Sequence, residues 1–395
     1  MDRHMLTAAR RAEQLLMETF GGAIRLGEGH NLGGSARTRV LRFPVLEGPP
    51  SAPANIVVKQ STSEVFDPTS ADDAAWLLFN DWASLEFLSQ IAAPVPLVPA
   101  LYGGDRQGGF LIMEDLQPKT RLDHLLLGND PDAAEAGLIA YAEVHGRLHA
   151  LTINRRAEYL RIRERLGPAA SANSYYSYRW LPAALQEIAA LLDVPIQPGA
   201  LEELEGLRAA LVTPGPFLTL VQSDAAPDNF LWDGETWCLI DFEGARYTHA
   251  LLEGAYCRMP FPTCWCVYRL PEALIQRMEA RYRAELSKSC PAAANETLFY
   301  RGLVEACLTW ALSFHRMMRP LEKMLEQDRC LVALTDRQRF LLYLNTAAHA
   351  SETFEHLPSV GRTVHQFARR LAQRWPEAVD PPYYPAFRDM SQRSL

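Results

Sequence analysis

The chain has 395 residues, of which 48% are hydrophobic and 22% are charged, and this composition is that of an ordinary globular protein rather than a disordered or membrane protein. Because a single hydrophobic core stops growing at about 250–300 residues, this length predicts two domains or lobes. The formal net charge of -8 argues against a nucleic-acid-binding protein, which usually carries a basic face, and it mildly favours a cationic small molecule as substrate.

The cysteines and the apolar segments of the sequence indicate the cellular compartment of the protein. The seven cysteines are an odd number scattered among apolar neighbours, which predicts reduced thiols rather than a disulfide framework. Cys264 and Cys266 are separated by one residue, but no second Cys or His pair stands at the spacing of a zinc site. Charges interrupt the N-terminal segment, and no uncharged apolar run approaches the roughly 20 residues of a membrane span. We therefore expect a cytoplasmic protein without a secretory signal, a membrane partner or a nucleic-acid partner.

The first third of the chain is rich in patterns that are typical of strands. An amphipathic helix is predicted at the N-terminus, since Ala, Leu and Met recur there at helical spacing until Gly21 and Gly22. Apolar runs bounded by Gly and Pro predict strands over residues 23–29, 36–45, 54–60, 101–105 and 108–116. A second helix is predicted over residues 74–92 from its helical periodicity. This order predicts a small, β-rich N-lobe over residues 1–115.

Helical patterns dominate the rest of the chain, for example over residues 134–151 and 181–192. One compact β-like stretch over residues 217–245 interrupts them. The whole distribution predicts an α/β fold of two lobes, with a large and mostly helical C-lobe over residues 116–395. The region after residue 250 is rich in aromatic residues, which we interpret as core rather than as a pocket for a cation.

The stretch over residues 217–245 contains two motifs with oxygen-bearing side chains. Asp224 and Asn229 stand in the spacing D-x-x-x-x-N, and Asp241 opens a D-F-E triplet further along the chain. Phosphoryl transfer needs one carboxylate that accepts the proton of the attacking hydroxyl, and a carbonyl oxygen and a second carboxylate that hold Mg²⁺ against the nucleotide phosphates. Oxygen ligands of this kind suit Mg²⁺. The three residues therefore predict an ATP- and Mg²⁺-dependent phosphotransferase.

The two motifs resemble the catalytic loop and the metal-binding triplet of the aminoglycoside/choline phosphotransferase family, small-molecule kinases with a protein-kinase-like fold. The resemblance implies that Asp224 is the catalytic base and that Asn229 and Asp241 ligate Mg²⁺. It also implies that the γ-phosphoryl group of ATP moves to a hydroxyl of an aminoglycoside-, choline-, nucleoside- or sugar-like small molecule. A protein kinase is disfavoured, because the triplet is D-F-E and not D-F-G.

The residues around the catalytic loop depart from the family pattern at one point. Relatives usually carry His-Gly immediately before the catalytic Asp, whereas this chain has Gln222 and Ser223. Gln can still form hydrogen bonds, but Ser lacks the backbone freedom of Gly. A catalytically impaired, nucleotide-binding regulatory protein of the same fold is therefore the alternative. Relatives also usually carry an Asp after the triplet that supports the loop, and Glu253 is the nearest acidic residue here.

Lys59 lies in the apolar run Ile-Val-Val-Lys-Gln and, by the same resemblance, has the position of the strand lysine that pairs with the α- and β-phosphates. A buried ammonium group requires a counter-charge. The family pattern favours Asp81 as that partner, with Glu86 as the competing candidate. The alternative is that Lys59 is an exposed residue of an edge strand.

A candidate phosphate loop lies upstream of the strand that carries Lys59. Its residues are Gly29, Gly33, Gly34 and Ser35. Glycines there let backbone amides approach phosphate oxygens closely, and the serine hydroxyl can add a donor. The segment does not fit G-x-G-x-x-G, and an ordinary hairpin turn is the alternative interpretation.

The run over residues 108–116 resembles the hinge between the lobes, where the family binds the adenine ring through backbone groups. Met113, Glu114 and Leu116 are the candidates for that contact, and a plain strand end is equally consistent with these residues. His145 and His149 stand one helical turn apart, but no glutamate or third ligand accompanies them, so we interpret them as core or interface residues rather than as metal ligands.

Overall fold

The computed structural model of the protein describes residues 3–35, 37–63, 66–70, 73–168, 177–330 and 332–392. The chain divides into two compact units, which we call the first and the second unit. The first unit consists of the described residues of Met1–Lys119, Arg155–Ser171 and Leu231–Arg246. The second unit consists of the described residues of Thr120–Asn154, Ala172–Phe230 and Tyr247–Leu395. The lobe boundary near residue 115 stays a prediction.

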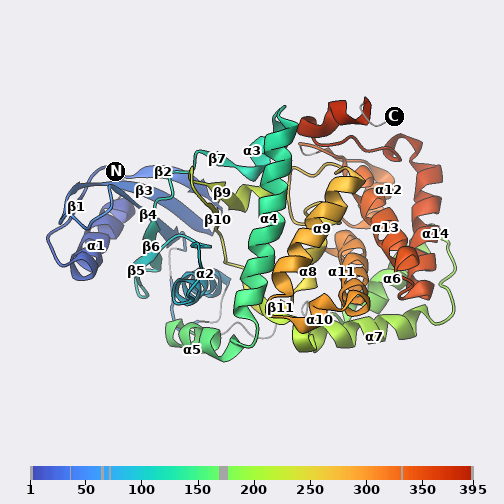
Figure 1. Ribbon diagram of the computed structural model, residues 1–395, viewed down its shortest axis with the longest axis horizontal. Coiled ribbons are helices and arrows are strands. Elements are labelled where there is room, and N and C mark those ends of the chain that lie inside the picture. Colours follow the sequence, from blue (N-terminus) through green and yellow to red (C-terminus); the bar gives the residue numbers. More distant parts are fainter. Residues whose placement is uncertain are drawn as a thin grey trace. The chain divides into compact units, whose positions relative to one another are not determined.

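An antiparallel sheet forms the centre of the first unit (Figure 1). Its strands are β1 (Arg25–Leu26), β2 (His30–Gly34), β3 (Thr38–Glu47), β4 (Asn55–Ser61), β5 (Leu101–Asp105) and β6 (Phe110–Glu114). They run in the order β1-β3-β4-β6-β5, and β2 also pairs with β3. Lys59 on β4 stands opposite Val40 of β3 and Leu111 of β6. It therefore lies on an interior strand, not on an edge.

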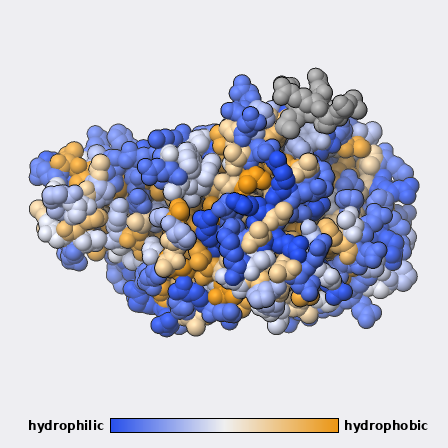
Figure 2. All heavy atoms as spheres, viewed as in Figure 1, coloured by the Kyte–Doolittle hydropathy of each residue, from blue (hydrophilic) through white to orange (hydrophobic). Residues whose placement is uncertain are grey.

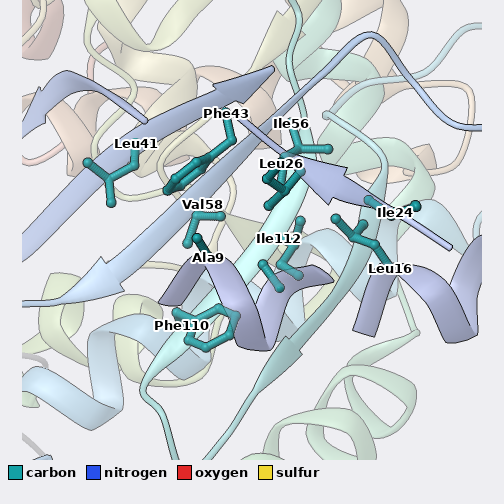
Figure 3. Packing of buried hydrophobic residues seen from close by; sticks show 11 residues of the cluster. Ala9, Leu16, Ile24, Leu26, Leu41, Phe43, Ile56, Val58, Phe110 and Ile112 are labelled. Carbon is teal, nitrogen blue, oxygen red and sulfur yellow. The ribbon is translucent and has the colours of Figure 1, made fainter. Parts of the chain in front are cut away.

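Helix α1 (Arg3–Phe20) covers one face of this sheet (Figure 3). Because alternate residues of a strand point to the same face, β3, β4 and β6 each contribute every second residue to a common core with the helix. That core consists of Ala9, Ala12, Leu16, Ile24, Leu26, Leu41, Phe43, Ile56, Val58, Phe110 and Ile112. Gly21 ends the helix with a φ of 72° and donates its N–H to the carbonyl oxygen of Met17, as a C-terminal glycine cap does.

Helix α2 (Asp73–Ser89) contacts β4, β5 and β6, and helix α5 (Arg156–Leu166) packs against α2. The rings of Phe87 and Tyr159 meet edge to face between these two helices. A helix that packs on both sides is expected to be apolar around most of its surface, as α2 is. Lys59 follows Val58, so its side chain points away from the α1 core and reaches Asp81 of α2.

The second unit is built mainly of helices. The helices are α3 (Leu122–Leu127), α4 (Pro131–Thr152), α6 (Trp180–Leu192), α7 (Ala200–Val212), α8 (Leu251–Gly254), α9 (Glu272–Leu286), α10 (Pro291–Ala294), α11 (Glu296–Met317), α12 (Leu321–Glu326), α13 (Asp336–Thr353) and α14 (Pro358–Arg374). Strand β8 (Leu218–Val221) pairs with β11 (Arg246–His249). In the first unit, strand β10 (Trp237–Leu239) pairs with β9 (Phe230–Trp232) and leads directly to Asp241.

Local signals fix the starts of the long helices in the second unit. The Asp130 side chain accepts hydrogen bonds from the first turn of α4, and Asn295 does the same for α11. Thr335 and Gln338 form a reciprocal capping box at the start of α13. Helix α4 then packs against α9, and α13 packs against both α11 and α14.

The outer surface of α4 and α9 is strongly hydrophilic, as the blue side chains over these helices in Figure 2 show. Glu143 of α4 lies 2.9 Å from Arg281 of α9 and 2.7 Å from Arg147 of its own helix. Arg277 and Glu135 form a further ion pair between the two helices. None of the helices in the described ranges combines the length and apolar character that a membrane crossing requires.

Candidate active site

Lys59 is the centre of a charged cluster in the first unit. Its Nζ atom lies 2.7 Å from Oδ2 of Asp81 and 2.5 Å from Oδ1 of Asp241. Oε2 of Glu243 stands at 3.7 Å. Lys59 and Asp81 are only 5% and 2% exposed, whereas the side chain of Asp241 is 31% exposed. The cluster therefore contains the buried ion pair of Lys59 with Asp81, and the Asp241 carboxylate, which is more exposed to solvent, contacts the same ammonium group.

The charges around Lys59 keep it protonated. Burial by itself lowers the pKa of this ammonium, but the neighbouring carboxylates of Asp81, Asp241 and Glu243 outweigh that effect and raise the pKa above its ordinary value. A lysine in this setting can act only as a fixed positive charge with hydrogen-bond donors, which is what the oxygens of a phosphate chain require.

Asp81 connects the lysine to the D-F-E segment. While its Oδ2 accepts from Lys59, its Oδ1 accepts a 3.0 Å hydrogen bond from the backbone N–H of Phe242. Glu86, the competing candidate, instead forms an ion pair with Arg165. The structure thus pairs Lys59 with Asp81, and the same carboxylate fixes the backbone next to Asp241.

Asp241 has a left-handed backbone, with a φ of 64°, a conformation that costs about 1–3 kcal/mol for a residue other than glycine. The residues around Glu243 hold this turn. The backbone oxygen of Glu243 accepts from Asn80 Nδ2 at 3.1 Å, and Oδ1 of Asn80 in turn accepts from Arg163 at 2.7 Å. Arg37 reaches the Glu243 carboxylate at 3.4 Å. Burial and the adjacent Asp241 charge raise the pKa of Glu243.

The candidate phosphate loop lies at the turn between β2 and β3. Gly34 has a φ of 136°, and a Cβ atom there would lie 2.1 Å from the carbonyl oxygen of Thr38, so no other residue fits. The Ser35 hydroxyl accepts from the backbone N–H groups of Arg37 and Thr38. Further back, a Cβ atom on Gly29 would lie 2.6 Å from the Phe43 ring. The fold alone therefore accounts for these residues, and their contact with phosphate stays a prediction, as does that of Gly33, an exposed residue of β2.

The hinge candidates lie at the end of β6. Met113 pairs with Val57 of β4 and with Leu101 of β5, so its backbone is part of the sheet. Glu114 donates its N–H to the carbonyl oxygen of Ala100 at 2.8 Å, and its carboxylate accepts from the Ala100 N–H at 3.0 Å. Leu116 follows the strand end. A role of these residues in binding adenine also stays a prediction.

In the second unit, Asp224 and Asn229 lie in one loop that follows β8. Asn229 Nδ2 donates to the backbone oxygen of Asp224 at 3.0 Å, which leaves the amide oxygen of Asn229 as the atom available to a cation. The Asp224 carboxylate accepts a 2.6 Å hydrogen bond from the hydroxyl of Thr263. The buried Tyr141 hydroxyl holds the intervening backbone by donating to the Ala225 oxygen at 2.7 Å.

Gln222 and Ser223 have specific partners in this loop. The Gln222 side chain is fully buried, and its Oε1 meets the His145 ring at 3.3 Å. Burial lowers the pKa of His145, so the neutral ring serves as a hydrogen-bonding partner. Ser223 has a φ of 76°, in the region that favours glycine, and its N–H donates to the Glu253 carboxylate. The left-handed backbone explains why glycine is favoured at this position, and the hydrogen bond to Glu253 stabilises serine in the same conformation.

Glu253 supports the loop from a buried position. Its other oxygen lies 2.8 Å from the His149 ring, whose second nitrogen lies 2.7 Å from the Tyr282 hydroxyl. His145 and His149 are therefore both engaged with protein groups. Within the described ranges, no group of three or more His, Cys, Asp or Glu side chains is arranged to hold a metal ion.

Residues 56–290 of the chain match the model of the phosphotransferase enzyme family, and this segment contains Lys59, Asp224, Asn229 and Asp241. The chain belongs to this family. The resemblance of the two motifs is thereby confirmed. A search among curated proteins returns no match for this phosphotransferase.

Among solved structures, three kinases are similar to this chain. The choline kinase of Cryptosporidium parvum Iowa II is 13% identical, with 91% of this chain and 99% of that chain covered and a TM-score of 0.50. The gentamicin complex of APH(2")-IIa is 12% identical, with coverages of 88% and 96% and a TM-score of 0.43. The ethanolamine kinase of Plasmodium vivax is 11% identical, with coverages of 81% and 82% and a TM-score of 0.42. The predicted α/β, two-lobed, protein-kinase-like fold is confirmed.

The aromatic residues of this phosphotransferase after residue 250 are mostly core. Tyr256, Phe261 and Tyr343 are fully buried, and Phe314 is nearly so. Tyr268 and Trp310 are half-buried, and Trp265 has 38% of its surface exposed. Several residues that the sequence did not single out contact the candidate site: Arg37, Asn80 and Thr263. They lie far from the motifs in sequence, and no spacing pattern could have indicated them.

The loop support by Glu253 can be tested through stability. Glu253→Ala is expected to lower the free energy of unfolding, because the Ser223 N–H and Nε2 of His149 each lose their contact with the buried carboxylate, at about 1–3 kcal/mol for each. Chemical denaturation measures the change. In Glu253→Gln the amide oxygen can still accept, so this variant should lose clearly less stability than Glu253→Ala. An equal loss in both variants would contradict the role given to the carboxylate oxygens.

Proposed function

We propose that the protein transfers the γ-phosphoryl group of ATP to a hydroxyl of a small molecule, with Mg²⁺ as cofactor and Asp224 as catalytic base. The observation that carries this proposal is the contact of Lys59 with both Asp81 and Asp241. A charged ammonium beside a partly exposed carboxylate is suited to the binding of a metal-bound polyphosphate. The spacing of Asp224 and Asn229 before Asp241 supports the same chemistry.

The side-chain chemistry of Asp241 and Asn229 suits a Mg²⁺ ion. Asp241 supplies a carboxylate and Asn229 an amide oxygen that no described hydrogen bond occupies. Mg²⁺ sites of this kind take one or two carboxylates from the protein and complete their shell with phosphate oxygens and water. When bound, the ion would neutralise the negative charge on the β- and γ-phosphates.

Each protein group has one role in the proposed reaction. Lys59 binds the α- and β-phosphates, and Asp81 keeps its ammonium in place. Asp224 accepts the proton of the acceptor hydroxyl, the acceptor oxygen attacks the γ-phosphorus, and ADP leaves with the electron pair of the broken bond. Backbone groups at Met113, Glu114 and Leu116 would bind adenine. The amides of Gly29, Gly33, Gly34 and Ser35 would approach the phosphates.

A screen of acceptors tests this proposal. The purified protein is incubated with ATP and Mg²⁺ and with pools of aminoglycosides, choline-like amines, nucleosides and sugars, and both ADP and phosphorylated product are measured. We expect at least one pool to give ADP and phosphorylated product in equal amounts, and chelation of Mg²⁺ to stop both. Mg²⁺-dependent ATP binding without transfer to any pool would contradict the proposal and favour the impaired regulatory protein.

A further inference from the structure

The segment from Thr263 to Cys266 lies against the loop that carries Asp224. Its side chains alternate in direction: Cys264 and Cys266 are buried and lie 3.1 Å apart, whereas Thr263 and Trp265 reach the loop. The Thr263 hydroxyl donates to Oδ1 of Asp224 at 2.6 Å. The Trp265 ring nitrogen donates to Oδ2 of Asp228 at 3.1 Å. One short segment thus holds two carboxylates of the same loop.

The hydrogen bonds at Thr263 have a fixed direction. An ionised carboxylate can only accept, so the single hydroxyl hydrogen of Thr263 must point to Asp224. The Tyr256 hydroxyl lies 3.2 Å from the same Thr263 oxygen and therefore donates to it. Tyr256 is fully buried, and burial raises its pKa well above the ordinary value, which keeps this donor protonated. The chain of donors runs from Tyr256 through Thr263 to Asp224.

Trp265 has the corresponding role at the other end of the loop. Oδ1 of Asp228 is buried and has no hydrogen-bond partner among the described residues, so the bond from Trp265 is what orients this carboxylate. Asp228 immediately precedes Asn229, and both lie in the turn Pro227–Asn229. The bond from Trp265 therefore anchors the same turn that carries Asn229.

The supporting segment is itself fixed by the helical core. Arg339 of α13, a buried residue, donates to the carbonyl oxygen of Cys264 at 3.0 Å. Tyr343, one turn further along α13, donates to the carbonyl oxygen of Pro260 at 3.0 Å. A site residue is held accurately only when the residues behind it are locked by packing and hydrogen bonds. Thr263 and Trp265 meet this condition.

We propose that Thr263 and Trp265 are positioning residues that fix the catalytic loop at two points, Thr263 at the Asp224 carboxylate and Trp265 at Asp228. This inference rests on the proposed function for its effect on turnover. Because Thr263 acts on Asp224, on the acceptor side of the reaction, its loss lowers kcat and leaves the KM for ATP unchanged. A purely structural role would instead lower the free energy of unfolding and the fraction of folded protein, while kcat per folded molecule would stay unchanged.

The test compares Thr263→Val with Thr263→Ser in steady-state turnover with an acceptor found in the screen. Loss of a hydrogen bond to a charged group is expected to reduce kcat by about 10- to 100-fold in Thr263→Val. Thr263→Ser keeps the hydroxyl and should recover most of the turnover. Thr309→Val makes the same chemical change at a buried position of α11, where the hydroxyl bonds, within the described part of the chain, only to the Glu305 backbone, and should leave kcat unchanged.

Amide hydrogen exchange gives a second measurement that does not depend on activity. Peptides that span the loop from Gln222 to Phe230 should exchange faster in Thr263→Val and in Trp265→Phe than in wild type, and at the wild-type rate in Thr263→Ser. Wild-type turnover and exchange in Thr263→Val, combined with an inactive Asp224→Asn, would overturn this inference and leave the proposed function intact. If no acceptor is phosphorylated by wild type, the proposed function fails, and the exchange rates alone decide whether the two residues hold the loop.

Discussion

Asp224→Asn is expected to reduce turnover by about 10²–10⁴-fold, the usual contribution of a general base. Asparagine has nearly the same shape and its amide oxygen can still accept the hydrogen bond from Thr263, so the loop should keep its conformation. It cannot, however, take up the proton of the acceptor hydroxyl. The KM for ATP should change little, because Lys59 and Asp241 are untouched. Steady-state kinetics with the best acceptor from the screen measures both constants.

The matched control for this variant is Asp193→Asn. It removes the same charge in the same unit, at the C-terminal end of α6, where the backbone is left-handed with a φ of 52° and asparagine is well tolerated. Turnover in this control should equal that of wild type. If Asp224→Asn were as active as Asp193→Asn, Asp224 would not be the base.

Lys59→Met is expected to abolish ATP binding and to destabilise the protein. The substitution leaves the buried Asp81 carboxylate without its counter-charge, and Asp241 loses the ammonium at 2.5 Å. Breaking a buried pair by removing one partner costs about 3–5 kcal/mol. Chemical denaturation measures the stability and calorimetric titration with Mg²⁺ and ATP measures binding.

Two further variants separate charge from stability in this cluster. Lys119→Met removes a lysine that is exposed in the same unit, and it should change neither ATP binding nor the free energy of unfolding by more than about 0.5 kcal/mol. The double variant Lys59→Met with Asp81→Asn should recover part of the lost stability, since no buried charge then lacks a partner, but it should still fail to bind ATP. ATP binding at wild-type affinity in Lys59→Met would contradict the role of the lysine.

The motifs were predictable from the sequence because the groups that act together are close along the chain. Asp224, Asn229 and Asp241 fall within one β-like stretch, and their residue types match the oxygen chemistry of Mg²⁺. The position of Lys59 on an apolar strand could also be predicted from the sequence. Its confinement to an interior strand was not, because strand order depends on long-range pairing that periodicity does not encode.

The contacts that hold these motifs could not be predicted, since they join residues that are far apart in sequence. Thr263 contacts Asp224 although β9, β10 and β11 lie between these two residues in the sequence. Likewise, Asn80 of α2 donates to the backbone oxygen of Glu243. Helix α5 belongs to the first unit although it follows α4 of the second unit in the chain. The segment expected as a glycine turn contains the short strand β2, because its pairing partner β3 supplies the hydrogen bonds.

The fate of the γ-phosphoryl group is the most direct test of the account. ATP labelled in its terminal phosphate is incubated with Mg²⁺ and the acceptor, and the labelled products are separated. With wild type, the label is predicted in a phosphate ester of the acceptor, and with Asp224→Asn it should remain in ATP. Label released as inorganic phosphate with no ester, or an ester formed equally fast by Asp224→Asn, would contradict transfer to a hydroxyl with Asp224 as base.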